Sequence, residues 1–379
     1  MPVLPVLAGS YAAADRPGVR DFILDTATGQ LTETSATSGV PYPAYLVHGR
    51  RPGWAYAVSE TTTSTQVGLG TAPEQSGTPG SVWALRPRRS GIGREVAGSQ
   101  PSGGELPTHL RLHPGGRWLA VSNYGTPTVA GSVAVLPVGE DGSLGPVVEL
   151  RGHAGSGPVQ ARQTCAHVHS TLFTPDGQYL IAADLGADTL VTYRFDPRSG
   201  RLAHVWTTPM PPGWGPRYLT WHVPTMRLLA VGELACEVAA LEFDPERGSL
   251  RMLDHVSTLV REAHGEVLAA DVAVSPNGRR CLVSNRGARD TIATVELRSD
   301  GRLALLAEAP SGGAWPRDFD LTPDGRLLVV ANEHSDVLAV LRVDANGVAG
   351  AELGSAPLPR ASFVAVGGAP SEHGQRVHR

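Results

Sequence analysis

The chain has 379 residues, of which 41% are hydrophobic, and a formal net charge of −4 at pH 7. This charge gives no reason to expect a nucleic acid or an anionic membrane as a partner. No stretch reaches the ~18 consecutive apolar residues of a membrane-spanning helix, and the first residues lack the charged start and apolar run of a signal peptide. Three scattered cysteines do not make a disulfide framework, so we expect a soluble protein of the reducing cytoplasm.

A repeated unit organises most of the chain. Each copy has a proline, a short turn and then an apolar run, and successive prolines are about 47 to 62 residues apart. Self-similarity at such a period indicates a repeat architecture. The six prolines are Pro52, Pro114, Pro175, Pro224, Pro276 and Pro323.

Each unit predicts four short antiparallel strands. An alternating strand precedes the proline, and a Pro-Asp-Gly or Pro-Asn-Gly turn follows, because proline presets φ and glycine accepts positive φ. A more apolar strand comes next, as in residues 327–331, then a third as in residues 188–195 and a fourth that begins at Arg201. Four strands per ~50 residues without helical periodicity are typical of a β-propeller, whereas a β-solenoid would need shorter repeats.

The two termini can complete the ring. Residues 362–366 form a strand with nothing after it, whereas residues 3–11, 19–24 and 29–31 form three strands with no first strand before them. Joining these strands closes the ring and removes exposed edges. We therefore predict an all-β fold, a single seven-bladed β-propeller over residues 1–367, in which N- and C-terminal strands share one blade.

Three segments fall outside the repeat. Residues 61–80 are rich in Thr, Ser, Gly and Pro, and residues 151–164 contain several glycines and lead directly into the next strand. Both segments predict surface loops, and the first is a candidate lid. The polar residues 368–379 predict a flexible C-terminal tail.

Polar residues stand at fixed places in the units. Nine residues after the proline, an apolar strand ends on a polar residue: Asn123, Asp184, Glu233, Asn285 and Asn332. Near the start of the preceding strand stand His109, His169, Arg217, Asp271 and Arg317. A hairpin brings the start of its first strand beside the end of its second, so both sets should meet at one end of the channel, where Arg286 joins them.

Two interpretations compete for these residues. Asn and Asp side chains often cap strand ends by bonding loop backbone, which would explain the asparagines and the two aspartates. Buried arginines and a buried glutamate need partners or a charged ligand, which favours a functional role for a second group. The predicted catalytic residues are His169, Arg217, Glu233 and Arg286. The predicted substrate-binding residues are His109, Asn123, His167, Asp184 and Arg317.

Other kinds of site have weaker support. Cys165, His167 and His169 alternate along one strand and so share a face, as zinc ligands could. They lack the usual paired spacing, and nearby arginines would repel a cation, so no metal is expected. No serine has the flanking glycines of a hydrolase nucleophile, and no glycine-rich loop opens a helix, so neither a catalytic triad nor a nucleotide site is predicted.

Several motifs form a pattern that covers nearly the whole chain. They are Gly9-Ser10-Tyr11, Pro107-Thr108-His109-Leu110, Ser122-Asn123-Tyr124-Gly125, Arg162-Gln163, His167-Val168-His169, Asp184-Leu185-Gly186-Ala187-Asp188, Gly215-Pro216-Arg217, Glu233-Leu234, Ser284-Asn285-Arg286-Gly287 and Pro316-Arg317-Asp318-Phe319. In these motifs the chain resembles the seven-bladed propeller lactonases, which include propeller-type 6-phosphogluconolactonases and fungal carboxy-cis,cis-muconate lactonizing enzymes. The resemblance implies an active site at His169, Arg217, Glu233 and Arg286. Where the family usually has Asn, Asn, His and Asn, this chain has Tyr42, Ser59, Tyr218 and Gly232.

The resemblance implies an enzyme that hydrolyses a sugar lactone without a cofactor, most simply 6-phosphogluconolactone to 6-phosphogluconate in the pentose phosphate pathway. Arg217 and Arg286 would hold the substrate anion, or one of them would stabilise the oxyanion. His169 or Glu233 would take a proton from the attacking water. A lactonase or lactonizing cycloisomerase for another acid, and a non-enzymatic binding propeller, are the alternatives. The expected partner is a small anionic lactone, and the oligomeric state stays open.

Overall fold

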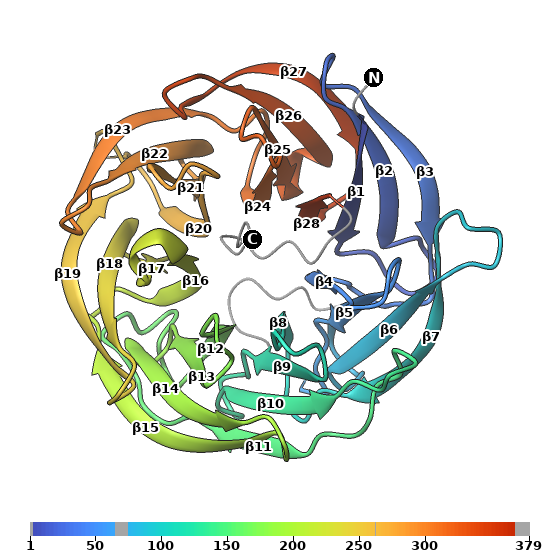
Figure 1. Ribbon diagram of the computed structural model, residues 1–379, viewed down its shortest axis with the longest axis horizontal. Helices are drawn as coiled ribbons and strands as arrows, with labels where there is room; N and C mark the ends of the chain where they lie inside the picture. Colours follow the sequence, from blue (N-terminus) through green and yellow to red (C-terminus); the bar gives the residue numbers. More distant parts are fainter. Residues whose placement is uncertain (1–2, 65–74, 262, 368–379) are drawn as a thin grey trace.

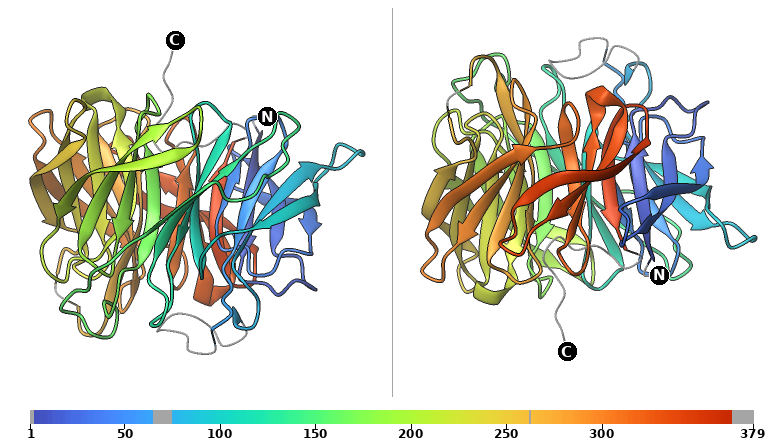
Figure 2. Two further views of the ribbon diagram at one scale, coloured as in Figure 1. Left: turned by 90° about the horizontal axis from the view of Figure 1, so that it is seen from below. Right: turned by 90° about the horizontal axis from the view of Figure 1, so that it is seen from above.

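The computed structural model describes residues 3–64, 75–261 and 263–367. Seven four-stranded antiparallel sheets stand as blades around a central channel (Figure 1). Seen from the side, the blades form a thick disc (Figure 2). The prediction of an all-β, seven-bladed propeller is confirmed.

The strands of each blade follow one another from the channel outward. The blade that joins the termini contains β28 (Ala361–Val366), β1 (Val3–Ser10), β2 (Val19–Asp25) and β3 (Leu31–Thr37). The next three blades contain β4 (Leu46–His48), β5 (Ala55–Ser59), β6 (Ser81–Pro87) and β7 (Arg94–Pro101); β8 (Pro107–Leu112), β9 (Trp118–Asn123), β10 (Ser132–Pro137) and β11 (Glu149–Gly152); and β12 (Val168–Phe173), β13 (Tyr179–Asp184), β14 (Thr189–Asp196) and β15 (Arg201–Pro209). The last three contain β16 (Pro216–His222), β17 (Arg227–Gly232), β18 (Glu237–Asp244) and β19 (Ser249–Ser257); β20 (Val267–Val274), β21 (Arg280–Gly287), β22 (Thr291–Leu297) and β23 (Leu303–Pro310); and β24 (Pro316–Leu321), β25 (Leu327–Asn332), β26 (Val337–Val343) and β27 (Ala349–Pro357).

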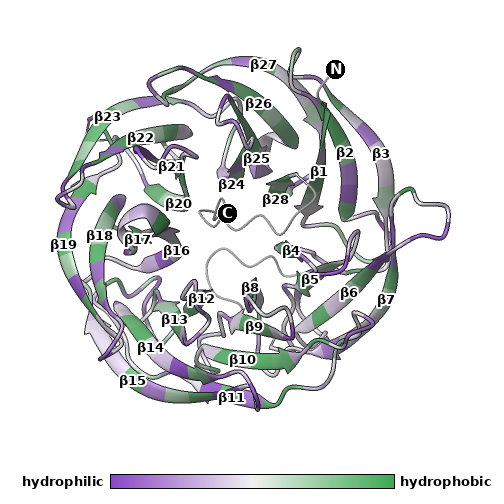
Figure 3. Cartoon of the chain, in the orientation of Figure 1, coloured by the Kyte–Doolittle hydropathy of each residue, from purple (hydrophilic) through white to green (hydrophobic). Residues whose placement is uncertain are grey.

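Burial falls from the channel to the rim. Every residue of β12 and β13 is buried, whereas most residues of the outermost β15 are partly or fully exposed. The hydropathy colouring shows the same trend, with polar residues concentrated on the outer strands (Figure 3). Inner strands are buried on both faces because each blade packs between two others, which explains their near-continuous apolar runs.

The predicted proline turns join the inner strand to the second strand. Between β12 and β13, Gly177 has a φ of 71°, a left-handed conformation that glycine adopts without a Cβ penalty. Asp176 secures the same turn: its Oδ1 accepts hydrogen bonds from Thr174 Oγ1 at 2.6 Å and from the amide of Gln178 at 3.0 Å. This side-chain capping favours a tight turn with one register, so the apolar strands that follow start at comparable places.

The ring closes as the termini predict. β1 pairs with β28 in antiparallel register, with Val6 opposite Val366 and Ala8 opposite Val364. On its other side β1 pairs with β2. A C-terminal strand therefore serves as the inner strand of the first blade, which removes the open edges that the ends of the sheet series would otherwise present.

The core lies between neighbouring blades. One cluster joins the blades of β12–β15 and β16–β19 and includes Ile181, Trp214 and Trp221, all nearly inaccessible to solvent. The indole of Trp221 donates a 2.8 Å hydrogen bond to the carbonyl of Phe173 in the neighbouring blade. Each buried aliphatic or aromatic side chain contributes about 1.5–3 kcal/mol of hydrophobic stabilisation, so these inter-blade contacts hold the ring together.

The predicted loop at 61–80 is described at its two ends, where Thr62 and Ser76 form an isolated bridge. Its central part, residues 65–74, and the predicted tail, residues 368–379, lie outside the described residues, as does the lid hypothesis. Within the described ranges, no helix is long and apolar enough to cross a membrane.

Candidate active site

A cavity of about 320 Å³ opens where the inner hairpins of several blades end. Part of its wall is formed by the residue at one equivalent place in several blades, at or directly after the end of the second strand. In three blades the last residue of the second strand pairs with the first residue of the inner strand: Asn123 with Pro107, Gly232 with Pro216 and Asn332 with Pro316. The wall residue comes next in the chain after Asn123, Gly232 or Asn332. The residues at this position that line the cavity are Glu60, Tyr124, Glu233, Arg286 and Glu333.

The register corrects one detail of the repeat count. Gly232, and not Glu233, is the equivalent of Asn123 and Asn332. The count from the proline slips by one because the Val223–Thr225 segment forms a 3-10 turn in which Pro224 stands one residue later than in the other blades. Glu233 still reaches the cavity, because successive residues of a strand point to opposite sides.

The asparagines at the strand ends bond to backbone. Nδ2 of Asn123 donates to the carbonyl of Ser102 at 3.3 Å, and Asn285 and Asn332 make the same bond to the residue that follows the outermost strand of the preceding blade. Asp184 likewise accepts bonds from His153 Nδ1 at 2.9 Å and from the amide of His167 at 2.8 Å. These bonds support the strand-capping interpretation for this set.

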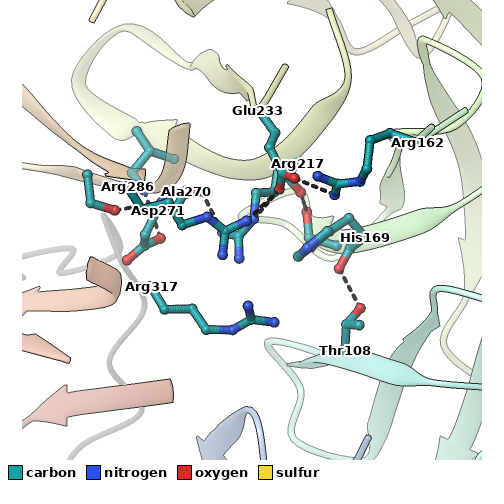
Figure 4. A network of polar contacts seen from close by, with 12 residues as sticks. Thr108, Arg162, His169, Arg217, Glu233, Ala270, Asp271, Arg286 and Arg317 are labelled. Carbon is teal, nitrogen blue, oxygen red and sulfur yellow. Dashed lines mark hydrogen bonds and ion pairs between the residues drawn. The ribbon is translucent and has the colours of Figure 1, made fainter. Parts of the chain in front are cut away.

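Glu233 is the centre of an ion network (Figure 4). Its carboxylate is fully buried and lies 2.5 Å from Arg162 Nη2, 2.8 Å from Arg217 Nε and 3.0 Å from Arg286 Nη2. The guanidinium of Arg217 also donates from Nη1 to the carbonyl of Ala270 at 2.6 Å. Glu233 thus contacts two other predicted catalytic residues, which come from two blades; Arg286 lines the cavity with it, whereas Arg217 does not.

The electrostatics of Glu233 follow from this arrangement. Burial by itself raises the pKa of a carboxyl group, but the charges of Arg162, Arg286 and Arg217 together outweigh burial and lower the pKa of Glu233 far below its usual range. A carboxylate so strongly stabilised in its ionised form is a poor proton acceptor near neutral pH. Glu233 therefore serves to hold the guanidinium groups of its three arginine partners in place.

His169 lines the same cavity from the start of β12. Its carbonyl accepts a hydrogen bond from Thr108 Oγ1 at 3.0 Å, and its ring packs edge-on against Tyr218 at 5.4 Å. The ring Nδ1 is buried and has no hydrogen-bond partner within the described chain. Burial and then the charge of Arg217 lower the pKa of His169 well below its ordinary value, so the imidazole is neutral at physiological pH.

Arg286 lines the cavity and has two donors without a partner. The residue is 4% exposed, and its Nε and Nη1 are buried without a hydrogen-bond partner among the residues that the structure describes. Its guanidinium lies over the ring of Trp315, 5.2 Å from the centroid. Buried donors of this kind are normally satisfied, so these two nitrogens mark a place for an acceptor from a ligand.

A second charged group lines the opposite part of the wall. Arg317 lies 3.8 Å from Glu60 and 3.6 Å from Glu333, and its guanidinium stands over the ring of Tyr11. The hydroxyl of Tyr11 donates a 2.7 Å hydrogen bond to Glu60. Burial raises the pKa of Glu60, and the charge of Arg317 offsets part of that rise.

A family model described as lactonase, seven-bladed β-propeller, matches residues 5–366. The chain belongs to this family. The lactonase is 30% identical over 337 residues to a 6-phosphogluconolactonase of Bacillus subtilis, covering 89% of this chain and 90% of that relative. It is 27% identical over 332 residues to a 6-phosphogluconolactonase of Formosa agariphila, covering 86% and 88% of the two chains.

Solved structures give the same result. A periplasmic gluconolactonase of Pseudomonas aeruginosa is 30% identical to the lactonase, with a TM-score of 0.87, over 97% of this chain and 100% of that chain. The family resemblance expected from the motifs is therefore confirmed, and with it the expectation of an enzyme of the lactonase class.

Several predicted residues of the lactonase are absent from the residues that line the cavity. The ring of His109 packs 4.4 Å from the ring of the buried Tyr45, and His167 stacks on Tyr124 at 4.3 Å. Asn123 and Asp184 make the structural bonds described above. Of the five residues predicted to bind substrate, the structure brings Arg317 to the cavity wall. A substrate-binding role for the other four stays a prediction without geometric support.

Sequence reasoning did not assign four charged residues of the cavity wall to the site: Glu60, Arg162, Glu266 and Glu333. Arg162 belongs to a matching motif, Arg162-Gln163, in a predicted loop, but nothing local indicates that the loop folds back onto Glu233. Glu60 and Glu333 immediately follow strand ends, so a count based on strand pairing would have placed them with Glu233. No group of three or more His, Cys, Asp or Glu residues in the described ranges could hold a metal ion.

One departure from the family pattern has a clear steric reason. A Cβ atom on Gly232 would lie 2.5 Å from the indole of Trp214, which fills the space of a side chain at this position. Trp214 is almost fully buried and donates from Nε1 to Glu237 at 2.9 Å. Tyr218, another departure, lies beneath Arg217, with the guanidinium 4.3 Å from the ring centroid. Neither Gly232 nor Tyr218 lines the cavity.

Proposed function

We propose that this lactonase hydrolyses 6-phosphogluconolactone to 6-phosphogluconate. Two relatives of moderate identity carry the name 6-phosphogluconolactonase, which supports the phosphorylated substrate. The observation that carries the proposal is the juxtaposition, in one cavity, of a neutral histidine with a free ring nitrogen and an arginine with two unpaired buried donors. With this substrate the enzyme would act in the pentose phosphate pathway, and the cysteine usage favours the cytoplasm.

His169 is the proposed general base. Its imidazole is neutral, buried and beside the cavity, so it can take a proton from a water molecule that attacks the lactone carbonyl carbon. The water oxygen bonds to that carbon, and the tetrahedral intermediate places its negative charge on the former carbonyl oxygen. The bond to the ring oxygen then breaks, and the imidazolium returns the proton to the departing alkoxide.

The three arginines around Glu233 have different proposed roles in the reaction. The free Nε and Nη1 donors of Arg286 suit the oxyanion of the intermediate, which is where preorganised donors contribute most. Arg162 is the most exposed of the three arginines around Glu233 and suits the phosphate of a substrate that enters from the mouth. Arg217 is buried and already bonded to Glu233 and Ala270, so it acts by positioning the carboxylate.

Single alanine variants of His169, Glu233, Arg217 and Arg286 test the site. Hydrolysis of 6-phosphogluconolactone should fall by about 10²–10⁴-fold when the general base is removed. The matched control is Glu242→Gln, which breaks an exposed pair with Arg251 far from the cavity. Wild-type rates in all four alanine variants would contradict the assignment.

The structural similarity to a gluconolactonase makes an unphosphorylated substrate the second candidate. A panel of 6-phosphogluconolactone, gluconolactone and a muconolactone separates the candidates, because the proposed enzyme should show its highest kcat/KM for the phosphorylated lactone. A higher kcat/KM for gluconolactone would favour the second candidate, and turnover of the muconolactone would favour the cycloisomerase alternative.

A further inference from the structure

Two Arg–Glu pairs stand at equivalent places in two blades, and the cavity is lined by Glu233 of one pair and by both residues of the other. Arg217 and Glu233 flank the pairing of Pro216 with Gly232, and Arg317 and Glu333 flank the pairing of Pro316 with Asn332. The first pair is close, at 2.8 Å, and the carboxylate has two further arginine partners. The second pair is open, at 3.6 Å, and its arginine faces a second carboxylate at 3.8 Å, while Glu333 also accepts a 3.4 Å bond from Arg360 Nη2. Equivalent backbone positions therefore hold one closed and one open ion pair.

The open pair has the chemistry of a hydroxyl-binding site. Distances of 3.6–3.8 Å exceed those of direct hydrogen bonds, so the guanidinium donors and carboxylate acceptors are not saturated by one another. A hydroxyl group is both a donor and an acceptor, and can therefore bond a carboxylate and a guanidinium at once. Two vicinal hydroxyls would meet Glu60 and Glu333 with Arg317 between them.

The same wall disfavours an anion. Glu60 and Glu333 are both buried, and each would repel a phosphate placed against it. Unpaired buried donors belong to two other arginines of the wall, Arg286 and Arg162. The part of the wall formed by Glu60 and Glu333 is therefore better suited to neutral, hydroxylated carbon atoms than to the anion.

Trp315 also lines the cavity, with its ring stacked on His334, and is held in a strained conformation. Its φ of 63° lies in the left-handed region, where a bulky residue is disfavoured, and the equivalent position before Pro216 carries a glycine with φ 64°. The amide of Trp315 is fixed by a 2.8 Å bond to Asp290 Oδ1. The ring contacts Arg286 and lines the cavity, where it offers apolar surface to the C–H groups of a sugar.

We propose that Glu60, Arg317 and Glu333 form a subsite that binds the hydroxyl groups of the lactone and makes the enzyme selective for polyhydroxylated lactones over alkyl lactones. The subsite deepens the proposed lactone hydrolysis and rests on it. The cavity itself, and the two buried nitrogens without a partner on the cavity-lining Arg286, indicate a ligand independently of the acidic residues.

The test compares kcat/KM for glucono-1,5-lactone and for δ-valerolactone, which has the same ring without hydroxyl groups, after subtraction of the uncatalysed rates. Wild-type enzyme should prefer gluconolactone. Glu60→Gln and Glu333→Gln, which keep side-chain shape, should reduce that preference by about 10- to 100-fold, the range expected for a hydrogen bond to a charged group. Glu242→Gln should leave the preference unchanged. Melting temperatures verify that each variant is folded.

A binding measurement separates failure of the subsite from failure of lactone hydrolysis. Titration calorimetry with gluconate and with 5-hydroxypentanoate, the two hydrolysis products, needs no turnover. If no lactone is hydrolysed but gluconate binds wild type more tightly than Glu333→Gln, the subsite stands and the proposed reaction fails. If both variants keep the wild-type preference in kinetics and in binding, or wild type has no preference, the subsite is wrong.

Discussion

Replacing Glu233 by glutamine tests whether this carboxylate holds the active site together. Glutamine keeps the shape of the side chain but removes its charge, and three guanidinium groups within 3.0 Å lose their counterion. Arg217 and Arg286 are almost fully buried, so solvent cannot compensate them. Breaking a buried ion pair in this way costs about 3–5 kcal/mol.

This cost predicts a measurable change in melting temperature. The unfolding entropy of about 2.1 cal/mol/K per residue gives about 0.8 kcal/mol/K for a chain of 379 residues. A loss of 3–5 kcal/mol should therefore lower Tm by about 4–6 °C in scanning calorimetry. The exposed control Glu242→Gln should change stability by less than about 0.5 kcal/mol, or less than about 1 °C.

A double variant sharpens the test. If repulsion among uncompensated arginines causes the loss, adding Arg286→Gln to Glu233→Gln should recover part of the lost Tm, because one buried charge disappears with its partner. A Tm of Glu233→Gln equal to or above that of wild type would refute the reasoning. Strictly additive losses in the double variant would show that the two residues do not interact energetically.

Three further predictions concern pH, loop anchoring and packing. Because burial and the charge of Arg217 lower the pKa of His169, the acid limb of the kcat/KM–pH profile should lie well below about pH 6.5, the ordinary histidine pKa. Arg286→Gln should move that limb to higher pH, because it removes a second positive charge that lowers the pKa of His169. A wild-type limb at or above about pH 6.5 would contradict this prediction. Asp188 accepts hydrogen bonds from Gln163 Nε2 at 2.8 Å and from the Gly215 amide at 2.7 Å, so Asp188→Ala should shift the neighbouring Arg162 and Arg217. The variant should lose about 2–3 kcal/mol of stability in urea unfolding and about tenfold in kcat/KM, whereas Asp141→Ala in an exposed turn should change neither quantity. An unchanged kcat/KM in Asp188→Ala would count against an anchoring role. Gly232→Ala should cost about 1–3 kcal/mol in urea unfolding, because the new Cβ meets the Trp214 indole at 2.5 Å, and a neutral result would mean that Trp214 can move aside.

The architecture could be predicted from local patterns. Proline turns, apolar runs and strand lengths recur with a fixed period, and each is set by backbone preferences and burial within one unit. The closure by β1 and β28 was also predictable, since an incomplete unit at each end leaves edges that pairing removes. Four of the five residues predicted to bind substrate are absent from the cavity wall, and for His109, Asn123 and Asp184 the reason is equally local: alternate residues of a strand face opposite ways, and a one-residue slip reverses the side.

The ion network around Glu233 could be recognised only from the tertiary structure. Arg162 meets Glu233 across 71 residues of sequence, and Arg286 meets it across 53, through a loop and a neighbouring blade whose positions no local pattern indicates. The open geometry of Arg317 between Glu60 and Glu333 likewise depends on distances between two blades that are far apart in the sequence. The sequence by itself therefore determined the repeated hairpins, their number and the residue types at their ends, because these follow from local backbone and burial preferences. The three-dimensional packing of the blades decided which end residues share the cavity, which of them neutralise one another and which keep free donors for a ligand, because these properties depend on separations of a few ångströms between distant segments.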